Sequence, residues 1–327
     1  MPLSFLPAEL LTHIISFACT DGGQTGCALN KTSKTFRAIC LNSSLDIQYV
    51  AIYGTQRINR FLDTIQHRPP SSRRVKSLLL RVDRENGSGP DHEFSTVIFS
   101  VVDVLLRPYI RVLHLFAYTS NAGGFELPQS FTLPYLHYFG RRDPPCPHLL
   151  DLYLPSFYSL GRVTEYDFAT VQSLRIQSIP TNLPHILRRV FPSLVELTID
   201  ALISGPANVN LVHYLSGYCS LEPPLSPNLR KVIVHWTQGQ AAVPDSYTNG
   251  TWRDDMLRDV MWNIGDSERV HVGWDRNGED DGGPFKIEVE GRALTVYAPL
   301  PLAEERMTME WEANKRLWLD ATGRWVL

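Results

Sequence analysis

The feature that most constrains this fold is a six-residue pattern, apolar-x-x-apolar-x-apolar, that recurs along most of the chain. The last two apolar positions are separated by a single residue, as they are on a strand with one buried face. The copies are Ile47/Val50/Ile52, Val75/Leu78/Leu80, Ile110/Leu113/Leu115, Leu149/Leu152/Leu154, Val171/Leu174/Ile176, Leu194/Leu197/Ile199 and Leu229/Val232/Val234, followed by a degraded copy at Val270/Val272. Each copy predicts a short strand that buries one face.

The spacing of the copies predicts how the strands are connected. Their central positions are separated by 28, 35, 39, 22, 23, 35 and 38 residues. The shortest steps match the period of leucine-rich repeats, and the longer ones imply insertions. Helix-like stretches lie between the strands, at Gln56 to His67, Phe94 to Leu106, Leu183 to Val190 and Trp252 to Trp262. This order predicts parallel strands with crossover helices.

The fold class predicted from this order is therefore α/β. We expect an irregular leucine-rich-repeat-like solenoid over residues 46–275. A single α/β sheet is the alternative that the pattern leaves open. We also expect Leu113, Leu152, Leu174, Leu197 and Val232 to occupy equivalent core positions of one hydrophobic stack.

The last part of the chain, residues 276–327, departs from the repeat. Phe285 to Glu290 and Ala293 to Ala298 flank Gly291-Arg292, which is typical of a β-hairpin. Ala303 to Leu319 then reads as a helix with aromatic residues on one side. We expect the hairpin and the helix to cap the repeats, because aromatic stripes usually pack.

The first forty-five residues predict two short amphipathic helices. Leu6, Leu10 and Ile14 follow each other at helical spacing, and Leu11 and Ile15 widen the apolar stripe. Pro7 can begin the first helix, and Asp21-Gly22-Gly23 ends it. Cys27, Leu29 and Phe36 give the second stretch a weaker apolar set. Both faces must be buried against something.

Residues 3 to 45 open with Leu6-Pro7-x-Glu9-Leu10-Leu11-x-x-Ile14 and close with Thr32-Ser33-Lys34-x-Phe36-Arg37. In these two motifs the segment resembles the F-box. Phe36 replaces the tryptophan that is usual in the family, and an insert from Asp21 to Gly26 lengthens the linker between the two helices.

The resemblance implies that residues 1–45 dock onto a Skp-type adaptor, and through it onto the cullin of a ubiquitin ligase. The residues that would bind the adaptor are Leu6, Pro7, Leu10, Leu11, Ile14, Ile15, Lys34 and Phe36. A helical cap on the first repeat, without any ubiquitin role, is the alternative.

The layout of the whole chain also resembles fungal F-box proteins with divergent leucine-rich tails, which implies a substrate receptor. Insertions in a solenoid gather on one face, often the binding face. The three longer insertions are Asp83 to His92, Tyr118 to Leu127 and Trp236 to Trp252, and the last two mix glycine and asparagine with aromatic residues. We expect a protein substrate to bind there, with Tyr118, Phe125, Tyr247 and Trp252 as candidate contacts.

Other observations narrow the class of protein. A net charge of −3 suggests no nucleic-acid partner, and no apolar run is long enough to span a membrane. Five cysteines without a Cys-x-x-Cys pair favour reduced thiols in the cytoplasm or nucleus. The chain carries no catalytic, cofactor-binding or zinc-spaced motif, so we expect no enzyme activity, cofactor or metal. An interaction scaffold and, less favoured, an α/β enzyme remain as alternatives to the receptor.

Overall fold

The computed structural model describes the chain in segments, which are residues 6–84, 97, 100–105, 109–119, 147–154, 168–176, 183–202, 214–215, 226–237, 270–274, 285–289 and 292–300. The chain forms two compact units. The N-terminal unit comprises Met1–Asp83, His92–Phe116 and Leu302–Leu327, and the C-terminal unit comprises Arg84–Asp91 and Ala117–Pro301.

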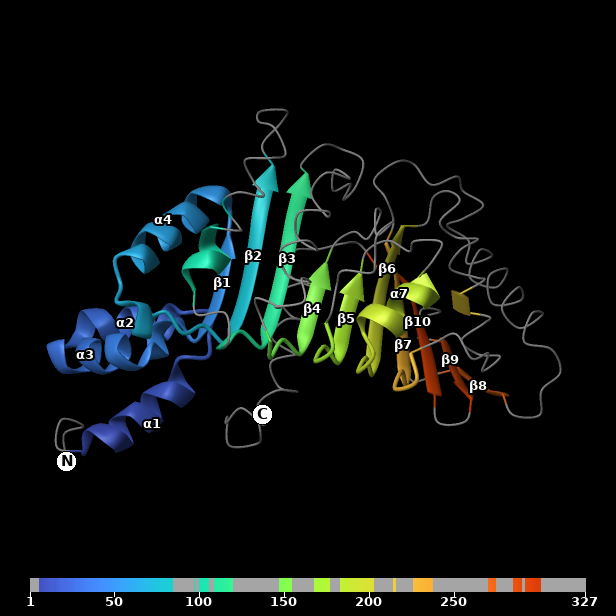
Figure 1. Ribbon diagram of the computed structural model, residues 1–327, viewed down its shortest axis with the longest axis horizontal. Helices are drawn as coiled ribbons and strands as arrows, with labels where there is room; N and C mark the ends of the chain where they lie inside the picture. Colours follow the sequence, from blue (N-terminus) through green and yellow to red (C-terminus); the bar gives the residue numbers. More distant parts are fainter. Residues whose placement is uncertain are drawn as a thin grey trace. The chain divides into compact units, whose positions relative to one another are not determined.

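The N-terminal unit begins with three helices and continues into strands (Figure 1). Its elements are α1 (Ala8–Ala18), α2 (Gln24–Thr32), α3 (Lys34–Ser43), the 3-10 helix η2 (Leu45–Ile47), β1 (Tyr49–Tyr53), α4 (Thr55–Gln66), the 3-10 helix η3 (Pro70–Ser72), β2 (Ser77–Arg84) and most of β3 (Val112–Thr119). The strand order is β1-β2-β3, with β1 parallel to β2. Helix α4 packs on β1 and buries Ile58 and Ile65.

Local chemistry sets the helix boundaries in this unit. The Asp21 carboxylate accepts hydrogen bonds from the N–H and the hydroxyl of Thr25, at 2.9 and 2.6 Å, and so stabilises the start of α2. Ser33 has extended backbone dihedrals, and its hydroxyl accepts a bond from the N–H of Phe36 at 3.1 Å. Ser44 ends α3 in the left-handed conformation, with φ of 56°.

The prediction of two N-terminal helices is therefore wrong, because Ser33 divides the second predicted helix into α2 and α3. The insert predicted in the linker is also shorter than Asp21 to Gly26. Residues 19–23 separate α1 from α2, and Gln24 to Gly26 already belong to α2.

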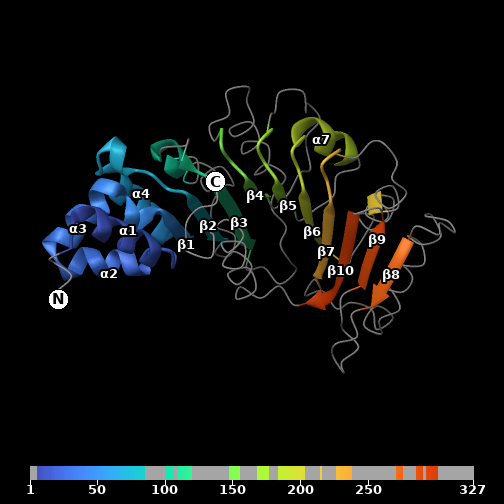
Figure 2. The same ribbon diagram turned by 90° about the horizontal axis from the view of Figure 1, so that it is seen from below.

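The C-terminal unit contains a second group of strands, ordered β4-β5-β6-β7-β10-β9-β8 (Figure 2). They are β4 (Asp151–Leu154), β5 (Ser173–Ile176), β6 (Glu196–Leu202), β7 (Lys231–Thr237), β8 (Val270–Trp274), β9 (Phe285–Val289) and β10 (Arg292–Leu300). Strands β4 to β7 are parallel, and β10 joins β7 in the same direction. Helix α7 (Leu183–Val190) connects β5 to β6 and buries Leu183, Ile186, Leu187 and Val190.

Six of the seven central positions of the full copies pair in register with the central position of a neighbouring copy. Val50 pairs with Leu78 in the N-terminal unit. In the C-terminal unit, Leu152 pairs with Leu174, Leu174 with Leu197, and Leu197 with Val232. The described apolar residues of the seven full copies are all buried. The strands and their buried face are thus confirmed as predicted.

A backbone hydrogen bond repeats at the start of the strands. The carbonyl oxygen of the second residue of one copy accepts two hydrogen bonds. Their donors are the backbone N–H groups of the second and third residues of the next copy. In the N-terminal unit, Gln48 O accepts from Lys76 N at 2.8 Å and from Ser77 N at 3.0 Å. In the C-terminal unit, Gln172 O accepts from Val195 N at 2.8 Å and from Glu196 N at 3.0 Å. The copies are therefore equivalent in backbone geometry as well as in side-chain pattern.

The end of the repeat differs from the prediction in one respect. The hairpin predicted around Gly291-Arg292 is present, since β9 and β10 are antiparallel. Val270 and Val272, however, lie in β8, which pairs with β9 in the antiparallel direction. They are therefore not an eighth parallel copy, and Leu294 of β10 takes the position beside Val232. The helix predicted at Ala303 to Leu319 lies outside the described residues.

The protein is thus α/β, with parallel strands, connecting helices and an antiparallel hairpin. Within the described segments, no helix is both long and apolar enough to cross a membrane.

Candidate functional site

Helix α1 exposes two large apolar side chains on one face. Leu10 is 51% exposed and Ile14 is 48% exposed, while Leu11 and Ile15, one position further along, are each 4% exposed. Residues i and i+4 of a helix are neighbours, so Leu10 and Ile14 form one continuous apolar strip. We call Leu10 and Ile14 the α1 strip. They are two of the four large apolar side chains that stand exposed in the described part of the chain.

The adjoining face of α1 packs against the rest of the three-helix module, which consists of α1, α2 and α3. Ile15 packs in a cluster with Cys19, Cys40 and Leu45. The Gln48 side chain donates hydrogen bonds to the carbonyls of Ser16 and Cys19, which lie at the end of α1. These carbonyls would otherwise lack partners within the helix. The α1 strip is therefore presented on a fixed helix.

The remaining residues predicted to bind an adaptor have different surroundings. Pro7 is exposed directly before α1, and Leu6 is half-buried. Lys34 is exposed at the first position of α3. Phe36 is only partly buried and packs against the Ile15 cluster. Leu11 and Ile15 are already buried within the chain, so they are not available to an adaptor. Fewer of the predicted adaptor-binding residues are therefore exposed than the sequence pattern indicates.

The candidate substrate contacts are almost entirely outside the described structure. Tyr118 lies in β3, where only its backbone position is described. Phe125, Tyr247 and Trp252 lie outside the described residues. Their role stays a prediction.

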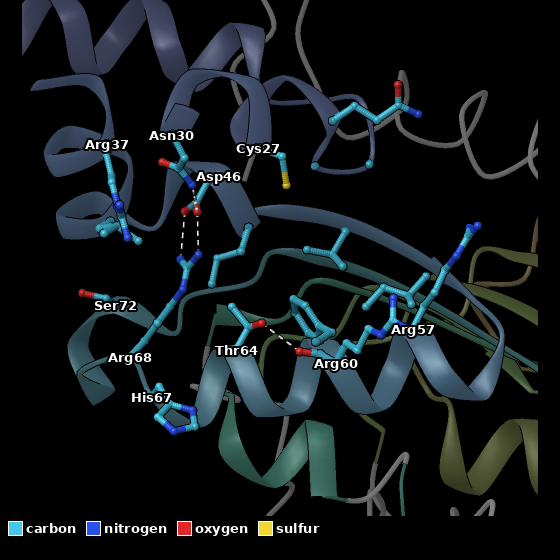
Figure 3. A pocket seen from close by; sticks show the side chains of 18 of the residues that line it. Cys27, Asn30, Arg37, Asp46, Arg57, Arg60, Thr64, His67, Arg68 and Ser72 are labelled. Carbon is cyan, nitrogen blue, oxygen red and sulfur yellow. Dashed lines mark hydrogen bonds and ion pairs between the residues drawn. The ribbon is translucent and has the colours of Figure 1, made fainter. Parts of the chain in front are cut away.

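A pocket in the N-terminal unit was not found by sequence reasoning (Figure 3). It has a volume of about 940 Å³ and lies between the α2–α3 side of the module, β1 and α4. Its apolar lining includes three residues of the first strand copy, and its polar lining includes Lys31, Arg37, Arg57 and Arg60. Separate cations on three helices give no sequence signal, because each one reads as part of an ordinary solvated face.

A buried ion pair holds one end of this pocket. The Arg68 guanidinium donates to both carboxylate oxygens of Asp46, at 2.9 and 2.5 Å, and Asn30 donates to the same carboxylate at 2.8 Å. Figure 3 shows the three side chains meeting. Gly26 permits this arrangement, since a Cβ there would lie 2.5 Å from the Cα of Asp46. The ion pair connects α2, η2 and the segment after α4.

Among the described residues, two buried cysteines, Cys19 and Cys40, share a hydrogen bond, and neither of them lines the pocket. This hydrogen bond lowers the pKa of the Cys40 thiol. A hydrogen bond with Cys40, together with burial, raises the pKa of the Cys19 thiol, so this thiol stays protonated at neutral pH. Such a buried thiol is a poor nucleophile. Among the described residues, no three His, Cys, Asp or Glu side chains are grouped so that they could hold a metal ion.

Comparison with known proteins adds no assignment. The chain matches no protein-family model, and comparisons with curated proteins and with solved structures gave no significant match.

Proposed function

We propose that the protein is a substrate-recognition subunit of a Skp-cullin-F-box ubiquitin ligase. In this proposal the α1 strip binds a Skp-type adaptor, and the strand-and-helix region holds a protein substrate. The ligase partners supply the ubiquitin-transfer chemistry, so this chain needs no catalytic group of its own.

The exposure of Leu10 and Ile14 is the observation that carries the proposal. Both residues belong to the opening motif that resembles an F-box. Leaving apolar surface in water is unfavourable by roughly 25 cal/mol per Å², so a paired apolar strip on a fixed helix favours a protein partner. Pro7 and Lys34, which belong to the same resemblance, are also exposed.

The alternative role for the module is a cap without a partner. A cap requires the buried residues Leu11 and Ile15, and they are consistent with that role. It does not require Leu10 and Ile14, which contribute little to the packing of the module because half of each side chain is in solvent. The exposure of the α1 strip therefore favours a docking module over a simple cap.

We further propose that the repeated strands form a leucine-rich-repeat-like solenoid. The in-register leucines and the recurring two-donor carbonyl bond support this, because both repeat from copy to copy. The alternative, a single α/β sheet, is supported by a different observation. Asp151 and Tyr153, which alternate with the core leucine of β4, are also buried, as in a sheet covered on both faces.

Co-purification tests the adaptor proposal. A tagged full-length chain should retain a purified Skp-type adaptor, and the Leu10→Ala/Ile14→Ala variant should lose it. The variant should keep the circular dichroism spectrum of the parent chain, because the altered side chains are half exposed. Retention of equal adaptor by both proteins would reject the proposal.

A further inference from the structure

We propose that the pocket of the N-terminal unit binds a short acidic peptide segment of a partner protein. An apolar side chain of the segment would lie on the pocket floor, and its carboxylates would pair with the arginines at the rim. This proposal does not depend on adaptor binding, because none of the eight residues predicted to bind the adaptor is among the described residues that line the pocket.

The floor of the pocket is the incompletely covered end of a hydrophobic core. Ile47, Val50 and Ile52 form the first strand copy and keep 6%, 4% and 8% of their surface exposed. The corresponding residues of the second copy, Val75, Leu78 and Leu80, are fully buried. Phe61 of α4 adds an aromatic side chain to the lining. Apolar surface of this kind favours an apolar group of a ligand over water.

The size of the pocket suits more than one side chain. Its volume of about 940 Å³ is at the upper end of the range for ligand sites, which is roughly 300–1,000 Å³. A single buried side chain would leave most of this space to water. A peptide segment of several residues fits the volume better.

The rim of the pocket is strongly cationic. Lys31 of α2, Arg37 of α3, and Arg57 and Arg60 of α4 are exposed around it. In the described structure none of these four side chains forms an ion pair with a carboxylate. Asp46 is the only acidic residue among the described lining, and Arg68 already neutralises it.

This local charge is opposite in sign to the net charge of the chain, which is −3. A concave site with charges of one sign concentrates ligands of the opposite sign. Arginine also matches the geometry of a carboxylate, because its guanidinium can donate two parallel hydrogen bonds. The charge of the rim therefore selects an acidic ligand.

The combination of floor and rim selects a peptide among acidic ligands. Nucleic-acid phosphates would meet the cations, but a sugar-phosphate backbone offers little to an aliphatic floor. A bilayer surface is broad and cannot follow a concave pocket. A segment that alternates acidic and apolar side chains satisfies both features at once, because carboxylates reach the rim while apolar side chains reach Ile47 and Val50.

The pocket is also held open by the structure around it. The Asp46–Arg68 ion pair and its bond from Asn30 join the two sides, with side-chain exposures of 2% for Asp46 and 11% for Arg68. A preformed site loses less conformational entropy on binding than a site that must first be ordered. The pocket can therefore bind a peptide without rearrangement of the module.

Fluorescence anisotropy with the full-length chain tests the proposal. The probe is a fluorescein-labelled peptide of about ten residues in which glutamate alternates with leucine. The comparison peptide replaces every glutamate with lysine. We expect saturable binding of the acidic probe, weaker binding at higher salt because exposed charges are screened, and no binding of the basic peptide.

Charge reversal locates the binding site. The Arg57→Glu/Arg60→Glu variant should bind the acidic probe at least tenfold more weakly. The matched control is Arg188→Glu/Arg189→Glu, which makes the same change of charge at exposed positions of α7 and should bind within twofold of the parent chain. Arg57→Gln/Arg60→Gln is a milder second variant for use if the reversal disturbs folding, and it should weaken binding at least threefold.

Three outcomes would overturn the proposal. The first is equal binding of the acidic and basic peptides, and the second is unchanged binding of the acidic probe by both Arg57/Arg60 variants. The third is failure of the acidic probe to bind, while phosphatidylserine vesicles or a single-stranded oligonucleotide bind through Arg57 and Arg60. Adaptor binding should be the same for the Arg57/Arg60 variants as for the parent chain. The peptide proposal and the adaptor proposal therefore fail independently.

Discussion

Replacement of Leu174 by alanine measures the strength of the in-register core. Leu174 of β5 has no exposed surface. It lies in register between Leu152 of β4 and Leu197 of β6. The shortened side chain loses about 2.4 kcal/mol of transfer free energy at about 0.8 kcal/mol per carbon. A residual cavity adds about 24 cal/mol per Å³, or about 1 kcal/mol for a void of about 40–50 Å³.

The free energy of unfolding should therefore fall by about 3–4 kcal/mol, as measured by urea denaturation followed by circular dichroism. The matched control is Val195→Ala, which removes an apolar side chain that is 41% exposed in the same unit. It should cost less than about 1 kcal/mol, because much of the side chain is already in water. Equal losses for the two variants would refute the assignment of Leu174 to the core.

Three further predictions concern the N-terminal unit. Gly26→Ala should lower the free energy of unfolding by about 1–3 kcal/mol, because the added Cβ would lie 2.5 Å from the Cα of Asp46; an unchanged denaturation midpoint would contradict this close approach. Ser44→Gly should raise the free energy of unfolding by about 1 kcal/mol, since it relieves a left-handed conformation and removes a buried hydroxyl that has no hydrogen-bond partner; a lower midpoint would count against it. Iodoacetamide at neutral pH should label exposed Cys27 far faster than buried Cys19, whose pKa is raised by a hydrogen bond to a second thiol and by burial; peptide mass spectrometry showing equal labelling would reverse this assignment.

The elements that the sequence predicts well are those in which periodicity alone decides the outcome. The amphipathic stretch from Gln56 to His67 is observed as α4, with a difference of one residue at each end. The stretch from Leu183 to Val190 is observed as α7 without change. Each has a clear apolar stripe that must face the core, so local sequence and tertiary packing favour the same helix.

The sequence-based predictions are wrong where one hydrophobic pattern is compatible with two different local structures. Val270 and Val272 alternate like the preceding copies, but an alternating strand can be parallel or antiparallel, and only its neighbour decides. At Ser33 the apolar spacing continues across a helix boundary that a single serine cap determines. Serine is a preferred N-cap, so this boundary could have been found from the residue type.

The candidate site shows the same limit. Periodicity identifies Leu10, Leu11, Ile14 and Ile15 as one wide stripe, but it does not tell which edge is covered by the rest of the chain. The structure covers Leu11 and Ile15 and leaves Leu10 and Ile14 exposed. The cationic pocket depends on residues that are far apart in sequence, so only the folded chain brings them together.

The affinity of the full-length chain for a purified Skp-type adaptor, measured by isothermal titration calorimetry, tests the central proposal most directly. About half of each side chain of the α1 strip remains to be buried, so Leu10 and Ile14 should together contribute about 1.5–3 kcal/mol to binding. The Leu10→Ala/Ile14→Ala variant should therefore bind about 10- to 140-fold more weakly than the parent chain, while the Val195→Ala control should bind as the parent does. An absence of measurable binding by the parent chain, or equal affinities for the parent and the double variant, would contradict the proposed docking role of α1.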